Sequence, residues 1–118
     1  MSSKARIGVS GVFGKKIVDY TNDDWDKVIN VNLRGVFNCL RAQLRVIEKG
    51  GSIVNMSSVA GLRGFGGASA YVSSKFGIIG LTRTAAQEMA SDGIRVNAVC
   101  PYVESLSSGT LRLVSEIY

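Results

Sequence analysis

The sequence predicts an α/β fold of the doubly wound class, in which helices flank a parallel sheet. Two long helical patterns, at residues 22–48 and 70–90, alternate with two short strand patterns, at 52–57 and 94–100. Strands connected through helices of this length pair in parallel by right-handed crossovers. Such sheets are covered on both faces, so two strands and two helices make only part of one. We therefore expect a single, incomplete domain over residues 1–118.

The first half of the chain contains a loop and a long amphipathic helix. Residues 1–20 show no sustained period and are punctuated by glycines, which predicts a loop. Thr21 or Asn22 then opens a helix, because the acidic residues that follow favour its dipole. Helical spacing continues to about Glu48, where Gly50-Gly51 ends it. The apolar positions are Trp25, Ile29, Val36, Leu40 and Ile47.

The second half repeats the alternation of strand and helix. Residues 52–57 predict a short strand, and the glycines that follow predict a loop. The helix at 70–90 has Gly93 as its expected C-terminal cap. The strand at 94–100 is expected to end at Pro101, which has no N–H to donate to a sheet. Residues 102–118 are ambiguous, so we treat them as a tail.

Composition excludes several classes of function. The chain has no histidine, which excludes His-based triads and the usual zinc sites. Cys39 and Cys100 lie far apart, so they indicate neither a metal site nor a disulfide framework. The net charge is +5, but the basic residues are spread from Lys4 to Arg112, which favours a solvated surface over a nucleic-acid footprint. Without a long apolar stretch or a signal-peptide pattern, we expect no membrane partner and a cytoplasmic location.

Three polar clusters follow the predicted strands. Ser57-Ser58 ends the first strand, residues 71–75 begin the next helix, and residues 101–105 follow the second strand. Ligands of open parallel sheets bind just outside the carboxyl ends of the strands. The sequence therefore places its candidate site at this edge.

Two of the candidate positions have both a structural and a chemical interpretation. Tyr71 and Lys75 are four residues apart, which places them on one face of a helix. An ammonium near a phenol favours the phenolate and assists proton transfer, but such a pair taken alone is more often a structural tyrosine covered by a lysine stem. Asn32 lies on the apolar stripe and should come level with Ser58, either as a buried structural amide or as a functional one.

Four sequence blocks in order resemble the short-chain dehydrogenase/reductase family. The similarity covers about residues 8–105 and is most specific between 21 and 101, the expected catalytic core. Ser58 and Tyr71 are separated by 71 − 58 = 13 positions, as in the family. The blocks are NVNLRG at 30–35, IVNMSSVAG at 53–61, YVSSK at 71–75 and RVNAVCP at 95–101.

The resemblance implies a partial Rossmann-like fold and an oxidoreductase that transfers hydride between NAD or NADP and a carbonyl or alcohol substrate. It implies that Tyr71 is the general acid or base and that Lys75 assists Tyr71 and holds the nicotinamide-ribose hydroxyls. Ser58, or less favourably Ser57, would hydrogen-bond the reacting oxygen, and Asn32 would hold a water linked to Lys75.

The resemblance also implies two cofactor contacts beyond Pro101. The family has Gly where Tyr102 stands, so a one-residue deletion aligns the following residues with its nicotinamide-side loop. Val103 and Ser105 then resemble the contacts to the carboxamide and phosphate.

The departures from the family affect the dinucleotide site. Its first strand and glycine-rich turn have no counterpart, and residues 5–8 keep only the last glycine of its Asn-Asn-Ala-Gly block. We therefore expect a truncated member with weak or no turnover. The alternative is a non-catalytic interaction fragment, because the family's subunit interface uses the helices that resemble 22–48 and 70–90. Under either hypothesis we expect a homo-oligomer.

Overall fold

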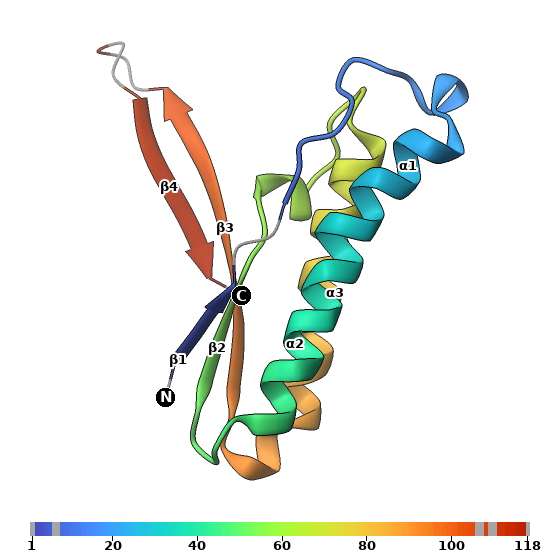
Figure 1. Cartoon of the computed structure of the whole chain (residues 1–118). Coiled ribbons are helices and arrows are strands. Elements are labelled where there is room, and N and C mark those ends of the chain that lie inside the picture. The colour runs from blue at the N-terminus through green and yellow to red at the C-terminus, as the bar shows by residue number, and fades with distance from the viewer. Residues whose placement is uncertain (1, 6–7, 106–107, 109–110, 118) are drawn as a thin grey trace.

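The chain forms one four-stranded sheet with its long helices packed as one layer against one of its faces (Figure 1). The computed structural model describes residues 2–5, 8–105, 108 and 111–117, with side chains described for 8–102 and 108. The strand order is β1-β2-β3-β4. The strands are β1 (Ser2–Ala5), β2 (Ser52–Met56), β3 (Arg95–Ser105) and β4 (Leu111–Ile117). The α/β class with a partial parallel sheet is confirmed.

The sheet is parallel through its first three strands and antiparallel at the fourth. Ser52 of β2 lies opposite Ser2 on one side and Arg95 on the other. The prediction that residues 1–20 are all loop is wrong, because Ser2–Ala5 pairs with β2 and Ile17–Asp19 forms a 3₁₀ turn. The short polar strand β1 carries no apolar alternation, and its pairing partner lies about fifty residues away. Its sequence alone therefore contained no strand signal.

The first long helix contains a π-helical segment. It runs through α1 (Asn22–Ile29), the π-helical segment η2 (Asn30–Arg34) and α2 (Gly35–Val46). Thr21 is the N-cap: its hydroxyl accepts a 3.0 Å hydrogen bond from the Asp24 amide, and the Asp24 carboxylate accepts one of 3.2 Å from the Thr21 amide. This reciprocal capping box satisfies two amides that the helix itself cannot pair. Backbone at Ile47 is already extended, so the helix ends slightly before Glu48.

The second long helix, α3 (Ser69–Glu88), follows the short 3₁₀ turn η3 (Val59–Gly61). Gly93 has a positive φ of 66°, as a C-terminal glycine should. It ends a separate 3₁₀ turn, η4 (Ala90–Asp92), however, and not α3, whose C-cap is Met89. The predicted cap is thus displaced by about one turn.

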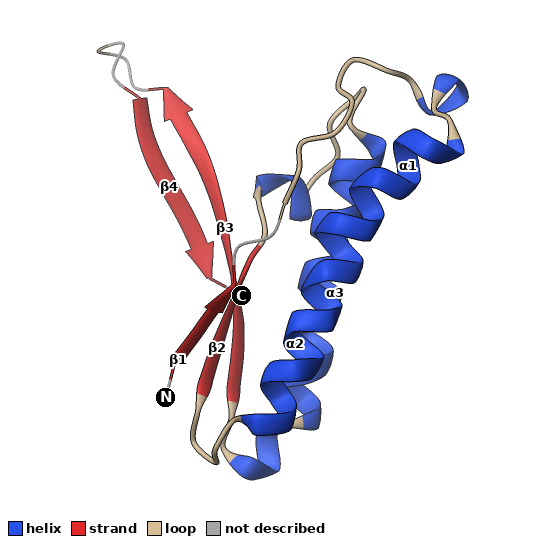
Figure 2. Ribbon diagram, viewed as in Figure 1, coloured by secondary structure: helices blue, strands red, loops and turns tan. Residues whose placement is uncertain are grey.

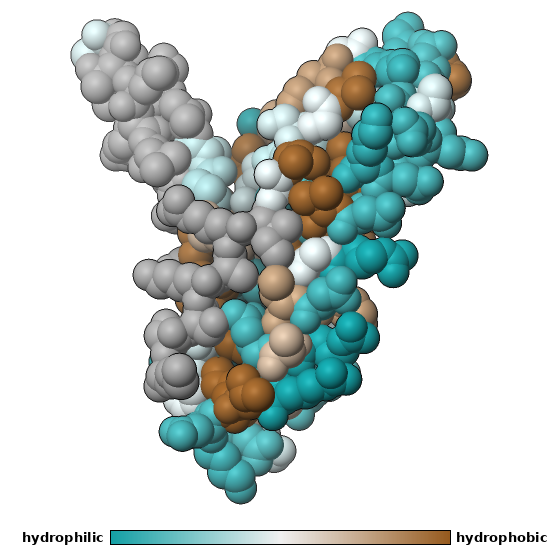
Figure 3. Space-filling view, in the orientation of Figure 1, coloured by the Kyte–Doolittle hydropathy of each residue, from teal (hydrophilic) through white to brown (hydrophobic). Residues whose placement is uncertain are grey.

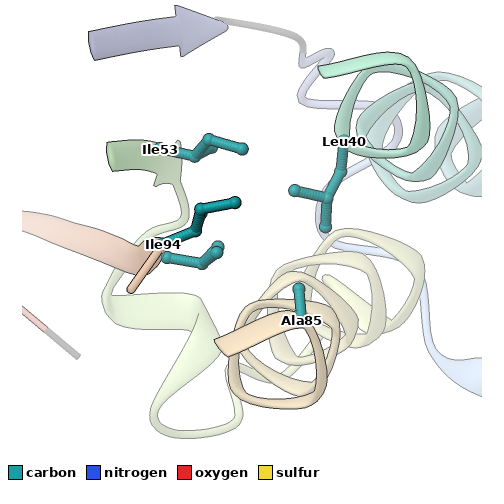
Figure 4. Packing of buried hydrophobic residues seen from close by; sticks show 5 residues of the cluster. Leu40, Ile53, Ala85 and Ile94 are labelled. Carbon is teal, nitrogen blue, oxygen red and sulfur yellow. The ribbon is translucent and has the colours of Figure 1, made fainter. Parts of the chain in front are cut away.

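Helices α2 and α3 lie side by side against the same face of the sheet (Figure 2). An apolar cluster joins these layers near the amino ends of β2 and β3 (Figure 4). Burial of aliphatic side chains at roughly 25 cal/mol per Å² is the main force that holds helix to sheet. The cluster consists of Leu40, Ile53, Ala85, Ile94 and Val96.

The prediction that Pro101 ends the second strand is wrong. β3 pairs with β2 as far as Val99, and from there to Ser105 it pairs with β4. Pro101 lies opposite Ser115 of β4, beyond the last residue that pairs with β2. Proline is tolerated there because the parallel ladder has already ended. Residues 102–118 thus contain a hairpin, whose tip falls largely outside the described residues.

Candidate functional site

The candidate site lies beyond the carboxyl end of β2, where η3 and the start of α3 meet. Ser57 is buried there: its amide donates to the Val99 carbonyl at 2.8 Å, and its hydroxyl donates to the Lys75 carbonyl at 2.9 Å. Gly61 packs directly on this junction, where a Cβ would lie 2.9 Å from the Lys75 carbonyl oxygen. Glycine is therefore needed at 61 for the turn to approach α3 this closely.

Tyr71 and Lys75 lie together on α3, as their spacing predicted. The Lys75 ammonium nitrogen is 5.5 Å from the centroid of the Tyr71 ring. Tyr71 is half-buried, and Lys75 is only 6% exposed. A cation this close to an aromatic ring is attracted to its face.

Lys75 is a buried cation without a carboxylate in ion-pair contact among the described residues. Burial lowers the pKa of Lys75 below the usual range for lysine, and the nearby Cys100 thiol acts in the opposite direction. Cys100 itself is fully buried in β3. Since burial disfavours the charged form, an additional polar partner at the ammonium would be stabilising.

Asn32 is fully buried in the π-helical segment and joins two other parts of the chain. Its Oδ1 accepts a 2.6 Å hydrogen bond from the Val9 amide, and its Nδ2 donates to the Val9 carbonyl at 2.9 Å. The same Nδ2 donates to the Ser74 hydroxyl at 3.2 Å, which in turn donates to the Tyr71 carbonyl at 2.7 Å. The structural role of this amide is therefore observed directly, since its hydrogen bonds hold the N-terminal loop against α3.

Gly8 adjoins both Lys75 and Asn32. A Cβ built on Gly8 would lie 3.5 Å from the Lys75 Nζ and 3.7 Å from the Asn32 Oδ1. The space that a side chain would fill is thus directly beside the buried ammonium.

Ser58 is half-buried and caps the η3 turn. Its hydroxyl oxygen accepts a 3.2 Å hydrogen bond from the Ala60 amide. Among the described contacts none links Ser58 to Tyr71, so the structure joins Tyr71, Lys75 and Asn32 but leaves Ser58 as a neighbour at the same edge. Because the Ser57 hydroxyl is committed to the Lys75 carbonyl, Ser58 is the more available of the two serines.

Val103 and Ser105 belong to the extended part of β3. Their backbones pair with Leu113 and Leu111 of β4. Their side chains lie outside the described residues, so their contacts to a cofactor stay predictions.

Two contributions to the site were missed by the sequence reasoning. The Phe13 ring packs against the Tyr71 ring with centroids 5.8 Å apart and planes tilted by 57°. Val9 contributes through its backbone atoms alone. A backbone partner has no signature in residue type, whereas a phenylalanine in a loop that is otherwise rich in glycine was a signal in the sequence.

A sheet whose first three strands are parallel, with a tyrosine–lysine pair on the helix at its carboxyl edge, is typical of the Rossmann-like α/β class. The sequence profile of the family described as Enoyl-(Acyl carrier protein) reductase matches residues 5–110. The chain belongs to the short-chain dehydrogenase/reductase family.

Individual relatives agree with this assignment. The chain is 52% identical over 98 residues to the short-chain dehydrogenase/reductase ABA4 of Pyricularia oryzae, covering 79% of this chain and 36% of ABA4. The structure of NAD⁺-bound xylitol dehydrogenase matches with a TM-score of 0.79 and 39% identity, over 85% of this chain and 39% of that one. An ElxO variant with NADPH bound matches with a TM-score of 0.78 and 36% identity, over 85% and 41% of the two chains. The chain thus spans little more than a third of the length of ABA4.

Within the described residues, no helix is long and apolar enough to cross a membrane. The same residues contain no group of three or more cysteine, aspartate or glutamate side chains that could hold a metal ion.

Proposed function

We propose that this chain carries the proton-transfer half of an oxidoreductase site, for hydride transfer between NAD or NADP and a carbonyl or alcohol substrate. The observation that carries the proposal is the buried Lys75 ammonium 5.5 Å from the Tyr71 ring. A lysine held this way has no obvious structural benefit, since burying its charge costs free energy. It does have a chemical one, because it favours the phenolate that proton transfer requires.

In this mechanism the nicotinamide supplies or accepts the hydride. Tyr71 donates a proton from its phenol to the carbonyl oxygen during reduction, or accepts the hydroxyl proton during oxidation. Lys75 stabilises the phenolate that results. Ser58 donates its hydroxyl proton in a hydrogen bond to the reacting oxygen and so orients it.

Asn32 acts on Tyr71 and Lys75 indirectly. We propose that it holds a water through which Lys75 exchanges protons with solvent. Its side chain also fixes Ser74, one position before Lys75, by a 3.2 Å hydrogen bond. The two roles are compatible, because a side chain tied to Val9 and Ser74 is held at one position beside Lys75.

The residues around Lys75 fit a nicotinamide riboside. The ammonium is buried without a carboxylate partner among the described residues, and Gly8 leaves the space beside its Nζ unfilled by a side chain. Ribose hydroxyls are suitable acceptors for an ammonium in that space. Val103 and Ser105 would hold the carboxamide and phosphate further along β3. The solved relatives with NAD⁺ and NADPH bound support this cofactor class without favouring either member.

We further propose weak or no turnover by a protein of these 118 residues alone. A glycine-rich turn between a first strand and helix, which holds the pyrophosphate in this family, is not found in this sequence. Much of the binding energy for a dinucleotide is then lacking, whereas the proton-transfer residues in the core at 21–101 are present. We likewise propose a cytoplasmic location.

The test uses reduced nicotinamide mononucleotide, which contains only the half of the cofactor that these residues would hold. In an NMR titration of the isotopically labelled chain, we expect the largest shifts at Gly8, Tyr71 and Lys75. Lys75→Met should weaken this binding about tenfold, as loss of a charged hydrogen-bond donor does. Shifts located elsewhere, or equal affinity of wild type and K75M, would contradict the proposal.

Turnover provides the complementary measurement. With NADPH or NADH and a panel of ketones, we expect rates far below the roughly 1–10³ s⁻¹ of typical enzymes, and Tyr71→Phe should abolish what remains. Rates within the typical range would overturn the proposal of weak turnover, while a rate that survives Y71F would overturn the role of Tyr71.

The helical face opposite the sheet supports a second candidate function, an interaction fragment that pairs with itself or with a full-length relative. Two apolar hollows of about 460 and 380 Å³ lie between α2 and α3, with Phe37 and Leu81 in both. Phe37 and Phe76 are 42% and 45% exposed. An apolar surface of this kind favours association, including a homo-oligomer. A well-behaved monomer in light scattering would count against this candidate.

A further inference from the structure

The loop that precedes α1 is anchored to the rest of the protein at several points. Beyond the Asn32 contacts to Val9, the Tyr20 hydroxyl donates to the Val12 carbonyl at 2.7 Å. Lys15 forms a 2.7 Å ion pair with Asp24 of α1. The backbones of Gly14 and Gly67 also lie close together: a Cβ on Gly67 would be 2.8 Å from the Gly14 Cα. Residues between these anchors are held at a defined place relative to α3.

Phe13 lies between these anchors and contacts the proposed proton donor. Its ring is 5.8 Å from that of Tyr71, with a 57° tilt that is favourable for two aromatic rings. Even so, 57% of Phe13 remains exposed. One part of the ring therefore contacts Tyr71, while most of its apolar surface remains open beside it.

Two other apolar side chains of the same loop, Val9 and Val12, are 42% and 36% exposed. They line a different hollow, of about 520 Å³, with Val28 and Val31 on the side of the first long helix. Figure 3 shows patches of hydrophobic surface (brown) among hydrophilic surface (teal) on the helical part of the molecule. An apolar surface adjoining a polar catalytic group is the usual composition of a small-molecule site, in which a few polar groups fix orientation and apolar walls hold the remainder.

We propose that Phe13 is a specificity-determining residue, which selects substrates whose carbonyl or carbinol carbon carries an apolar ring or chain. The proposal rests on the function proposed above, because it places the reacting oxygen at Tyr71. With the oxygen there, the substituents of the substrate lie beside the adjoining Phe13 ring. A small polar ketone would leave that ring in water, whereas an aryl or long alkyl substituent would cover it.

A matched pair of ketones tests this specificity without any cofactor. Benzylacetone and butanone share the same ketone end and differ by a phenyl group. In NMR titrations we expect the wild-type chain to bind benzylacetone at least tenfold more tightly, with shifts at Phe13 and Tyr71. Phe13→Ala should reduce this preference about tenfold, in the range that a substrate's apolar groups contribute in a hydrophobic pocket.

Two control variants distinguish loss of the Phe13 ring from general effects of substitution. Phe13→Leu, which keeps apolar bulk, should retain part of the preference. Phe76→Ala removes an aromatic ring of similar exposure on α3 and should leave the preference unchanged. No wild-type preference, or equal losses in F13A and F76A, would overturn the proposal. Failure of the proposed function has a different signature, namely loss of specific binding of reduced nicotinamide mononucleotide while the ketone preference remains.

Discussion

The two ends of the helix-on-sheet layer are built from different chemistry. At the amino ends of β2 and β3, an apolar end consists of Leu40, Ile53, Ala85, Ile94 and Val96. At the carboxyl end of β2, a polar end consists of Asn32, Ser57, Ser74 and Lys75, all of them also buried. Both ends connect the same pair of helices to the sheet or to the loops beyond it. Only the polar end contains groups that can move a proton.

The difference separates stability from function. Aliphatic burial contributes free energy without demanding a partner for each atom. Buried polar groups contribute little net stability, since each hydrogen bond replaces one to water, but they fix geometry because leaving them unpaired is costly. We therefore expect substitutions at the apolar end to change stability alone, and those at the polar end to change stability and ligand binding together or in opposite directions.

The largest effect is expected at the apolar end. Leu40→Ala leaves a cavity among the cluster residues and should lower the free energy of unfolding by about 2–5 kcal/mol. Urea denaturation measures this loss, and affinity for reduced nicotinamide mononucleotide should be unchanged in the folded fraction. Val46→Ala, at an 80% exposed position on α2, is the matched control and should have little effect. Weaker binding of the mononucleotide by folded L40A would contradict the proposal that the apolar end affects stability alone.

An intermediate effect is expected for Asn32→Ala at the polar end. The variant loses three hydrogen bonds and leaves the Val9 and Ser74 groups to find other partners, which should cost about 1–3 kcal/mol. Hydrogen exchange at the Val9 amide should accelerate, and binding of the mononucleotide should weaken. The exposed Asn38, which accepts a hydrogen bond from Arg41, provides the control N38A. Unchanged exchange at Val9 would show that Asn32 does not hold the loop.

The smallest effect on the free energy of unfolding is expected for Lys75→Met, and it is an increase. Burial keeps the folded-state pKa of Lys75 below its ordinary value of 10.5. Between these two pKa values the unfolded chain binds more protons, so wild-type stability rises with pH across that window. K75M removes the buried charge and should therefore gain about 1 kcal/mol at pH 7 while losing mononucleotide affinity.

The pH dependence checks the cause of that gain. The advantage of K75M over wild type should shrink as pH rises through the folded-state pKa of Lys75 toward 10.5. Denaturation at several pH values measures it. A pH-independent advantage would assign the gain to packing of the methionine instead of removal of charge.

Local sequence patterns predicted most helices and strands of the helix-on-sheet layer, and they predicted the pairing of Tyr71 with Lys75 in the site. The i,i+4 spacing of Tyr71 and Lys75, the helix start at Thr21 or Asn22 and the strand at 52–57 each depend on neighbours in sequence. The structure contains all three, with Thr21 as the cap and the strand ending at Met56. The doubly wound class followed from their order. Here sequence reasoning succeeded because the causes are short-range.

The features that were missed depend on distant partners. β1 becomes a strand only by pairing with β2, and β3 continues past Pro101 only because β4 returns beside it. Phe13 meets Tyr71 across 58 positions of chain, and Asn32 binds backbone atoms of Val9, which carry no residue-specific signal. The chemical roles of Ser58, Val103 and Ser105 still depend on the resemblance to the family.

The π-helical segment has a consequence for which sequence changes the helix can tolerate. Val28, Asn32, Val36 and Leu40 are all buried and recur every fourth residue. In a regular α-helix each residue advances about 100°, so this stripe would drift by about 40° at every step. The wider turn at Asn30–Arg34 absorbs part of that drift and keeps Asn32 facing inward beside its apolar neighbours. A one-residue deletion there would restore a regular helix, yet it would rotate the amide at 32 away from the residues on one side of it, so insertions and deletions should be tolerated far less than substitutions.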